Sequence, residues 1–571
     1  MEINRPLPVP QMVRERARAQ PDRPAIVCGS RTLAYGELWE ESERLAGRIQ
    51  HTPGFRPDRP VGTYFERGID GLVAQLALWR AGGFFVPLDP ALPRKRVRTL
   101  LEKSATELVL AQQGLDSEAL EGVATVCWTG TGPHTRLRQA SGKTAYLLFT
   151  SGSEGEPKGV SVPHTGLANL LAWHGHAYGT APGVRTAAFA GLGFDAYVWE
   201  TWAALSHGAT LFLPDVPLCG DITAVHRFLE KHAIQHCFLS TPLAEQLLAL
   251  ERPPASLIKL FTGGDRLRVR PARTYPAAVH NHYGPTEATV VATATGDLRA
   301  RSGSRLPPIG SPLPGVEVRL VDARGSVVDG ARQEGQLLIA GAQLADGYWL
   351  DAELTRERFS VHPDGRRWYA TGDICRWSDD GDLEFVGRAD AQISVRGHRV
   401  EPAEAEHVLL GVPGVTQAVC LPVDDGTGTA LYAFCAGTAA EDEVRAAARD
   451  ELPAHLVPSR IVRVPALPLT AHGKVDREAL LELAEAGPAS EQGSAGLNPL
   501  ERDIAAVWTE LTGIAPGPGD DFFSIGGHSI LAAKMIDTVR TRFRIDLGLA
   551  EVFAHPRLSD FAQRVTAARE L

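Results

Sequence analysis

The sequence predicts an α/β protein over residues 1–388, a smaller α+β unit over 389–484, and an all-α helical bundle over 498–571. Three observations support this fold class: short apolar runs alternate with helical segments, the next stretch mixes both types, and the last stretch lacks strand-like runs. A chain of 571 residues is too long for one ordinary core. A Gly-, Pro- and Ser-containing linker is expected at 485–497.

The first region contains apolar runs bounded by Gly and Pro, which predict buried strands. They lie at 25–27, 108–110, 145–149 and 337–339. Between the strands, residues 35–49 and 71–81 carry apolar side chains every three or four positions, which is typical of helices.

The second region predicts strands at 418–421 and 431–434. A helix is expected to begin near Pro402, because proline is favoured at the first helical position and Glu404 and Glu406 follow in the opening turns.

The last region predicts helices at 499–511, 529–542 and 558–569. In the middle helix, Leu531, Met535 and Val539 recur every four residues and define one apolar face of a small bundle.

Composition excludes several classes of function. A net charge of −10 with no basic block argues against a nucleic-acid partner. The seven cysteines are scattered without a C-x-x-C pair, so no disulfide framework or zinc site is expected. The N-terminus does not resemble a signal peptide, and no apolar run of about 18 residues could span a membrane. We therefore expect a cytoplasmic protein with no membrane partner.

The strongest local motif is TSGSEGEPKG at 150–159, directly after an apolar run. Small residues let backbone N–H groups approach phosphate oxygens, hydroxyls add donors, and Lys158 adds positive charge. The spacing differs from a Walker A loop. The loop therefore predicts phosphate binding outside the P-loop class.

A series of motifs surrounds this loop. It comprises LAYGEL (33–38), RAGGFFVPLD (80–89), FD (194–195), NHYGPTE (281–287), GYW (347–349), TGD (371–373), GRAD (387–390), RGHR (396–399) and GKVDR (473–477). In this order the series resembles the adenylation domains of non-ribosomal peptide synthetases, members of the adenylate-forming family that includes acyl-CoA synthetases and luciferases. The resemblance covers about residues 10–484 and implies ATP and Mg²⁺ as cosubstrate and cofactor.

The resemblance implies a role for each matched residue. Lys474, Thr286 and Glu287 would be catalytic, with Glu287 also binding Mg²⁺. Asp390 would be the hinge about which a mobile small unit, residues 389–484, rotates. The ATP-binding residues would be Thr150, Ser151, Gly152, Ser153, Gly155, Lys158, Gly264, Tyr283, Asp373 and Arg388. A cation and a metal suit this chemistry, because a carboxylate attacking a phosphate concentrates negative charge. The chain departs from the family at Glu154, where threonine is usual, and this leaves the loop's phosphate contacts open.

The resemblance also implies a substrate pocket. Its residues would be Asp195, Ala196, Trp199, Phe238, Phe261, Gly263, His282, Val290 and Val291. Asp195 would bind the ammonium group of an amino acid, and Lys474 its carboxylate. The remaining lining is mostly apolar, so charged side chains would be excluded by desolvation. Leucine is favoured, and proline is the alternative because His282, Val290 and Val291 also occur together in proline-type pockets.

The motif DFFSIGGHSI at 521–530 resembles the attachment site of peptidyl carrier proteins. Ser529 would carry 4′-phosphopantetheine at the start of a helix, where a phosphodiester is favoured. The implied partners are a phosphopantetheinyl transferase, a downstream condensation or tailoring enzyme, and an MbtH-like protein. No condensation or thioesterase motif occurs, so we expect the chain to load a residue for natural-product biosynthesis without forming a peptide bond.

Two other functions remain open from the sequence. An acyl- or aryl-acid:CoA ligase of the same family is disfavoured by Asp195, since such acids lack an ammonium group. A carrier scaffold with an inactive adenylation domain has Glu154 as its support.

Overall fold

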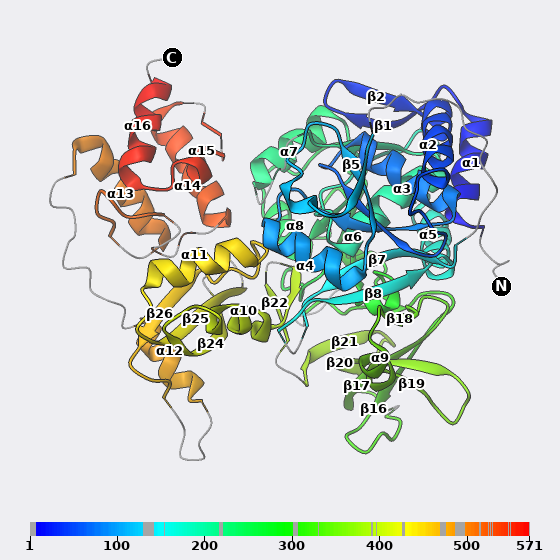
Figure 1. Cartoon of the computed structure of the whole chain (residues 1–571). Helices are drawn as coiled ribbons and strands as arrows, with labels where there is room; N and C mark the ends of the chain where they lie inside the picture. The colour runs from blue at the N-terminus through cyan, green and yellow to red at the C-terminus, as the bar shows by residue number, and fades with distance from the viewer. Residues whose placement is uncertain are drawn as a thin grey trace. The chain divides into compact units, whose positions relative to one another are not determined.

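The computed structural model describes most of the chain (Figure 1). The described residues are 7–569 apart from 129–141, 153–154, 216–217, 219–220, 301–305, 329, 390–391, 396, 425–428, 469–474, 486–496, 513–514, 523–524, 526, 528, 546 and 549. The chain forms two compact units, whose main segments meet between Val400 and Glu401. Within the described part, no helix is both long enough and apolar enough to cross a membrane.

The first unit contains a nine-stranded sheet. Its spatial order is β15-β14-β13-β12-β11-β9-β10-β1-β2, parallel from β13 through β1 and antiparallel at both edges. The strands are β1 (Pro24–Cys28), β2 (Arg31–Ala34), β9 (Arg185–Ala187), β10 (Thr210–Leu213), β11 (His236–Ser240), β12 (Lys259–Gly263), β13 (Ala278–Tyr283), β14 (Thr293–Ala294) and β15 (Ser311–Pro312). Parallel strands joined by helices confirm the α/β fold predicted for this region.

A second, seven-stranded sheet has the order β18-β8-β7-β4-β3-β5-β6. The strands are β3 (Pro60–Tyr64), β4 (Phe84–Leu88), β5 (Leu108–Gln112), β6 (Ala124–Trp128), β7 (Thr144–Thr150), β8 (Lys158–Pro163) and β18 (Gly347–Tyr348). β7 and β8 form the antiparallel hairpin that carries the glycine-rich loop.

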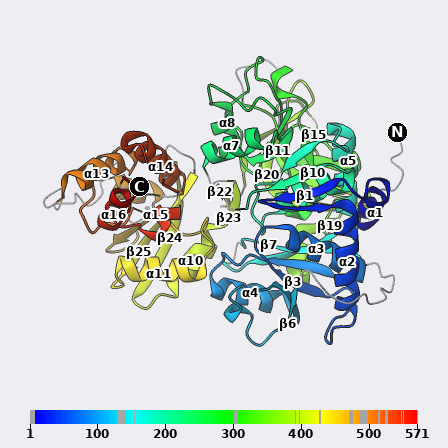
Figure 2. The same ribbon diagram turned by 90° about the horizontal axis from the view of Figure 1, so that it is seen from above.

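Helices connect and cover these strands (Figures 1 and 2). They are α1 (Val9–Ala19), α2 (Tyr35–Gln50), α3 (Ile69–Ala81), α4 (Arg94–Ser104), α5 (His164–Tyr178), α6 (Asp195–His207), α7 (Ile222–Lys231), α8 (Thr241–Leu248) and α9 (Ala352–Arg358). α3 is buried on nearly all sides because it contacts β3, β4 and β5 of one sheet and β1 of the other. Trp79 of α3 packs on Trp202 of α6 with ring centroids 4.5 Å apart, so the two helices share one core.

A third sheet completes the first unit. It contains β16 (Val316–Val321), β17 (Glu334–Gly341), β19 (Phe359–Val361), β20 (Arg367–Trp377) and β21 (Leu383–Arg388). The short pair β22 (Ile393–Val395) and β23 (His398–Val400) follows. The register of β20 and β21 places Asp373 opposite Arg388.

The second unit begins with an α+β segment and ends with helices. The α+β segment contains α10 (Pro402–Leu410), β24 (Val415–Asp424), β25 (Thr429–Gly437), α11 (Glu441–Glu451), β26 (Arg460–Val464) and α12 (Arg477–Glu485). The final helices are α13 (Pro499–Thr512), α14 (Ser529–Phe543), α15 (Ala550–Ala554) and α16 (Leu558–Arg569). Leu531, Met535 and Val539 are buried as the periodicity of α14 predicts, and Trp508 packs against Phe522 at 5.0 Å between ring centroids. The expected linker lies almost entirely outside the described residues.

Candidate active site

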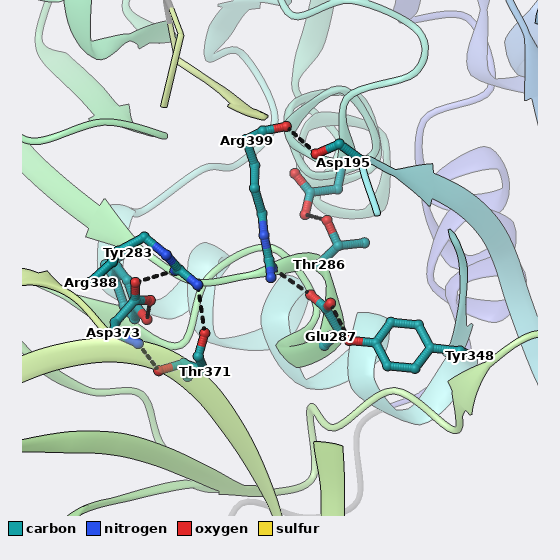
Figure 3. Close-up of polar contacts among 10 residues, drawn as sticks. Asp195, Tyr283, Thr286, Glu287, Tyr348, Thr371, Asp373, Arg388 and Arg399 are labelled. Carbon is teal, nitrogen blue, oxygen red and sulfur yellow. Dashed lines mark hydrogen bonds and ion pairs between the residues drawn. The ribbon is translucent and has the colours of Figure 1, made fainter. Parts of the chain in front are cut away.

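A buried carboxylate stands at the first position of α6. Asp195 is 6% exposed, and its Oδ2 accepts a hydrogen bond of 2.8 Å from Oγ1 of Thr286 (Figure 3). Burial raises the pKa of Asp195 to about 6, although the hydrogen bond from Thr286 partly offsets this effect. The group is therefore charged at neutral pH, and none of the described residues forms an ion pair with it. Such a site favours binding of a cation.

Glu287 follows Thr286 in a single 3-10 turn after β13 and is completely buried. Its Oε1 accepts a 2.7 Å hydrogen bond from the Tyr348 hydroxyl, and its Oε2 lies 2.9 Å from Nη1 of Arg399 (Figure 3). Burial alone would raise the pKa of Glu287, but Arg399 and Lys158 outweigh it and hold that pKa at about 2. A single ionised carboxylate fits Mg²⁺, which usually takes its other oxygens from water and substrate phosphates.

Three residues expected to bind the nucleoside lie together. The Tyr283 hydroxyl donates a hydrogen bond to Asp373, and Arg388 forms an ion pair with the other carboxylate oxygen (Figure 3). Thr371 Oγ1 accepts a hydrogen bond of 2.9 Å from the backbone N–H of Asp373, which helps to fix the position of Asp373. Burial raises the pKa of Tyr283 above its ordinary value, so the hydroxyl keeps its proton. Carboxylate and guanidinium groups arranged in this way can hold sugar hydroxyls.

The described part of the glycine-rich loop presents hydroxyls at the end of β7. The buried Thr150 hydroxyl has no hydrogen-bond partner among the described residues, and Ser151 Oγ donates to the backbone carbonyl of Arg399 at 2.9 Å. A Cβ at Gly152 would stand 1.9 Å from the Glu156 carbonyl oxygen, so only glycine fits there. A buried hydroxyl of this kind can donate a hydrogen bond to a phosphate oxygen.

The structure describes three further residues of the ATP set. Lys158 opens β8, with its ammonium 5.4 Å from the centre of the Tyr348 ring. Gly264 follows β12 with φ +89°, and a Cβ there would lie 2.8 Å from the Gly397 carbonyl oxygen. Gly155 also has positive φ. Ser153 and Glu154 lie outside the described residues.

Four of the predicted lining residues of the substrate pocket have rings that form one cluster, which we call the aromatic wall or pocket wall. The Trp199 ring lies 4.9 Å from His282, 5.6 Å from Phe238 and 5.9 Å from Phe261 between ring centroids. All four are less than 5% exposed, as is Ala196. A cavity of about 20 Å³, lined in part by Trp199, Phe238 and Phe261, has room for one water molecule, so the rings are closely packed. At Gly263 a Cβ would lie 2.5 Å from the His282 carbonyl oxygen, which explains the absence of a side chain.

The remaining lining residues belong to a strained segment. Val290 has φ +66°, an unfavourable backbone conformation for a β-branched residue, and Val291 next to it is buried. Gln343 Nε2 donates to the Val291 carbonyl at 2.6 Å, and its backbone carbonyl accepts from Thr289 Oγ1 at 2.6 Å. Gln343 therefore helps to hold the strained turn in place.

Two of the predicted site residues are not described by the structure, and a third, Ser529, is placed by its helix. Lys474 and Asp390 lie outside the described residues. Ser529 is the first residue of α14, so the proposed attachment point lies at a helix N-terminus. A Cβ at Gly527 would lie 2.4 Å from the Phe522 ring, so the chain needs glycine two residues before Ser529. A helix N-terminus fits a phosphodiester such as that of phosphopantetheine.

Sequence reasoning assigned no role to four residues that contact the site. Arg399 and Tyr348 lie within recognised motifs, but their contacts with Glu287 come from distant parts of the chain. Tyr178 and His174 contact His282 and Trp199 from α5. Tyr178 and His174 lie four residues apart on α5, but that spacing alone does not show that they contact His282 and Trp199.

Comparison with known proteins places this arrangement in a family. The AMP-binding enzyme model matches residues 13–349, the AMP-binding enzyme C-terminal domain matches 404–474, and the phosphopantetheine attachment site matches 502–565. The chain belongs to the AMP-binding enzyme family, which uses ATP to form adenylates, and carries a phosphopantetheine attachment domain.

Individual relatives point to peptide synthetases. Tyrocidine synthase 3 of Brevibacillus parabrevis is 34% identical over 98% of this chain, and phosphinothricin tripeptide synthetase PhsC of Streptomyces viridochromogenes is 35% identical over 98%. The chain spans only 9% and 53% of these two relatives. The solved structure of holo-PA1221, an NRPS protein containing adenylation and PCP domains, has a TM-score of 0.85 and 29% identity, covering 99% of this chain and 97% of that one. The chain is similar to these proteins along nearly its whole length.

Proposed function

We propose that the chain activates an apolar amino acid, leucine above all, as its adenylate and loads it onto the phosphopantetheine arm of its own carrier domain. The observation that carries the proposal is the buried Asp195 carboxylate on α6, the helix that also carries Trp199 of the closely packed aromatic wall. The carboxylate would hold the substrate ammonium. The wall would surround an uncharged side chain and exclude charged ones, which lose hydration without a partner. A CoA ligase of acyl or aryl acids would have no use for Asp195.

The remaining residues would each bind a different part of ATP. Asp373 and Arg388 would hold the ribose, with Tyr283 against the adenine, and Thr150 and Lys158 would bind phosphate oxygens. Glu287 would hold Mg²⁺, which when bound neutralises phosphate charge. Lys474 would bind the substrate carboxylate and the α-phosphate. Asp390 would be the hinge about which the small unit rotates between two half-reactions, formation of the adenylate and transfer of the amino acid to the phosphopantetheine thiol.

The carrier domain extends the proposal to partners. A phosphopantetheinyl transferase would modify Ser529, and the attached arm would supply the thiol that accepts the amino acid. A downstream condensation or tailoring enzyme would then take the loaded residue. An MbtH-like protein is a further proposed partner, and a cytoplasmic location is proposed for the chain.

Amino-acid-dependent exchange of pyrophosphate into ATP tests the substrate assignment. Across all proteinogenic amino acids, leucine is expected to give the highest kcat/KM. Valine should react about tenfold or more slowly, because it lacks one methylene and a methylene in an apolar pocket is worth about 1–3 kcal/mol. Isoleucine, which has the same number of carbons but branches one carbon nearer the backbone, should also react more slowly. Reactions without amino acid provide the baseline. A preference for a charged side chain would contradict the pocket assignment, proline above leucine would favour the alternative substrate, and exchange with fatty or aryl acids alone would indicate a CoA ligase.

A further inference from the structure

Two polar atoms in the aromatic wall are engaged by one turn of α5. Tyr178 contacts His282, and His174 contacts Trp199. The two α5 residues are four positions apart, so they share one face of the helix. Both are 5% exposed or less. Neither belongs to the set of residues expected to line the pocket.

The partners of His282 determine which of its nitrogens carries the proton. Nδ1 lies 3.2 Å from the carbonyl oxygen of Thr262, which can only accept a hydrogen bond, so Nδ1 is the protonated nitrogen. Nε2 is then an acceptor, and the Tyr178 hydroxyl donates to it at 2.6 Å. Burial lowers the pKa of His282 to about 3, so the ring stays neutral. Both nitrogens of His282 are therefore occupied.

The indole of Trp199 is satisfied in the same way. Its Nε1–H donates to Nδ1 of His174 at 3.1 Å. His174 must then carry its proton on Nε2, which donates to Thr180 Oγ1 at 3.0 Å. The Thr180 hydroxyl also lies within hydrogen-bond distance of Nδ1 of His236, at 3.3 Å. Because His174 occupies its N–H, Trp199 has only an apolar ring surface to offer a substrate.

We infer that Tyr178 is a positioning residue for specificity: by occupying Nε2 of His282, it withholds that acceptor from the substrate and so disfavours amino acids with polar side chains. The inference rests on the proposed function and deepens it. A polar side chain entering this wall would lose its water without gaining a hydrogen bond to His282, whereas an aliphatic side chain of the same size has no such hydrogen bond to lose.

Replacing Tyr178 with phenylalanine tests this role with little change in packing, since the ring that lies 4.5 Å from Phe261 is kept. Nε2 of His282 becomes a free acceptor. In pyrophosphate exchange, the ratio of kcat/KM for leucine to that for asparagine, which has nearly the same shape, is expected to fall about tenfold. The ratio of valine to threonine should fall in the same direction.

Two matched variants separate this role from a structural one. Tyr275→Phe also removes a buried tyrosine hydroxyl, but that hydroxyl has no hydrogen-bond partner in the described part of the chain, so both ratios should stay at their wild-type values. In a His282→Leu background, Tyr178→Phe should no longer change the leucine-to-asparagine ratio, because its effect passes through His282.

The outcomes distinguish this inference from the proposed function. Exchange that persists in Tyr178→Phe with an unchanged leucine-to-asparagine ratio would overturn the role of Tyr178 and leave the proposed function standing. An equal shift in Tyr275→Phe would also overturn it. Absence of exchange with every amino acid in the wild-type chain would overturn the proposed function itself, and the role of Tyr178 with it.

Discussion

Replacing Asp195 with asparagine is expected to reduce leucine-dependent exchange strongly while making the ligand-free protein more stable at neutral pH. The side chain keeps its shape and can still accept the hydrogen bond from Thr286. It loses the charge that would pair with the substrate ammonium. Loss of one member of a buried charge pair costs about 2–5 kcal/mol, so kcat/KM should fall about thirtyfold or more.

The gain in stability follows from the pKa of Asp195. Folding raises this pKa from 3.8 to about 6, so the folded state binds the proton more tightly than the unfolded state. The contribution of Asp195 to the free energy of unfolding is fully present below pH 3.8 and is lost as the pH rises through 6. At neutral pH the protein is therefore less stable, by about 3 kcal/mol, than it would be with Asp195 protonated. Asparagine avoids that cost, so urea denaturation should show a gain of about 1–3 kcal/mol at pH 8 and a smaller gain at pH 5.

A second aspartate provides the control. Asp297 is paired with Arg299, and its pKa is lowered by hydrogen bonds from Arg299 and the backbone, which together outweigh burial. Asp297→Asn should therefore reduce stability at pH 8, the opposite direction to Asp195→Asn. Leucine-dependent exchange within tenfold of wild type in Asp195→Asn would contradict the proposed ammonium site.

Replacing Ser529 with alanine is expected to prevent phosphopantetheine attachment completely while leaving amino-acid activation within about twofold of wild type. The hydroxyl at the start of α14 would be the only acceptor of the arm, and it belongs to a different compact unit from Asp195 and Glu287. Intact-mass spectrometry after incubation with a phosphopantetheinyl transferase and coenzyme A measures attachment.

Ser559 provides the matched serine in the same domain, because it lies half-buried in the first turn of α16. Ser559→Ala should gain the full mass of the arm. A full mass gain in Ser529→Ala would show that another residue is the attachment point.

The helices of the carrier region show how much local pattern can predict. The sequence predicts the end helix at 558–569, where it forms, and the middle helix begins at Ser529 as expected. Both have apolar residues at helical spacing over several turns, and that spacing defines a buried face. α15 was not predicted, because five residues are too few to display a period.

The site shows where sequence reasoning stops. The motifs identified Asp195, Glu287 and Asp373, and these residues lie in the polar clusters described above. The motifs did not reveal that Arg399 pairs with Glu287, because that contact joins residues 112 positions apart. Tyr178 was missed for the same reason: its contact with His282 joins the end of α5 to β13, 104 positions along the chain. Such pairings follow from tertiary structure, and one sequence does not contain them as a local signal.

The central claim is that this chain both activates an amino acid and loads its own carrier domain. Intact-mass spectrometry of the phosphopantetheine-bearing wild-type chain, incubated with leucine, ATP and Mg²⁺, tests it most directly. The account predicts a mass gain of one leucyl group, absent when ATP is omitted and absent from Ser529→Ala. A chain that carries the arm and catalyses leucine-dependent exchange, yet gains no leucyl mass, would contradict the claim.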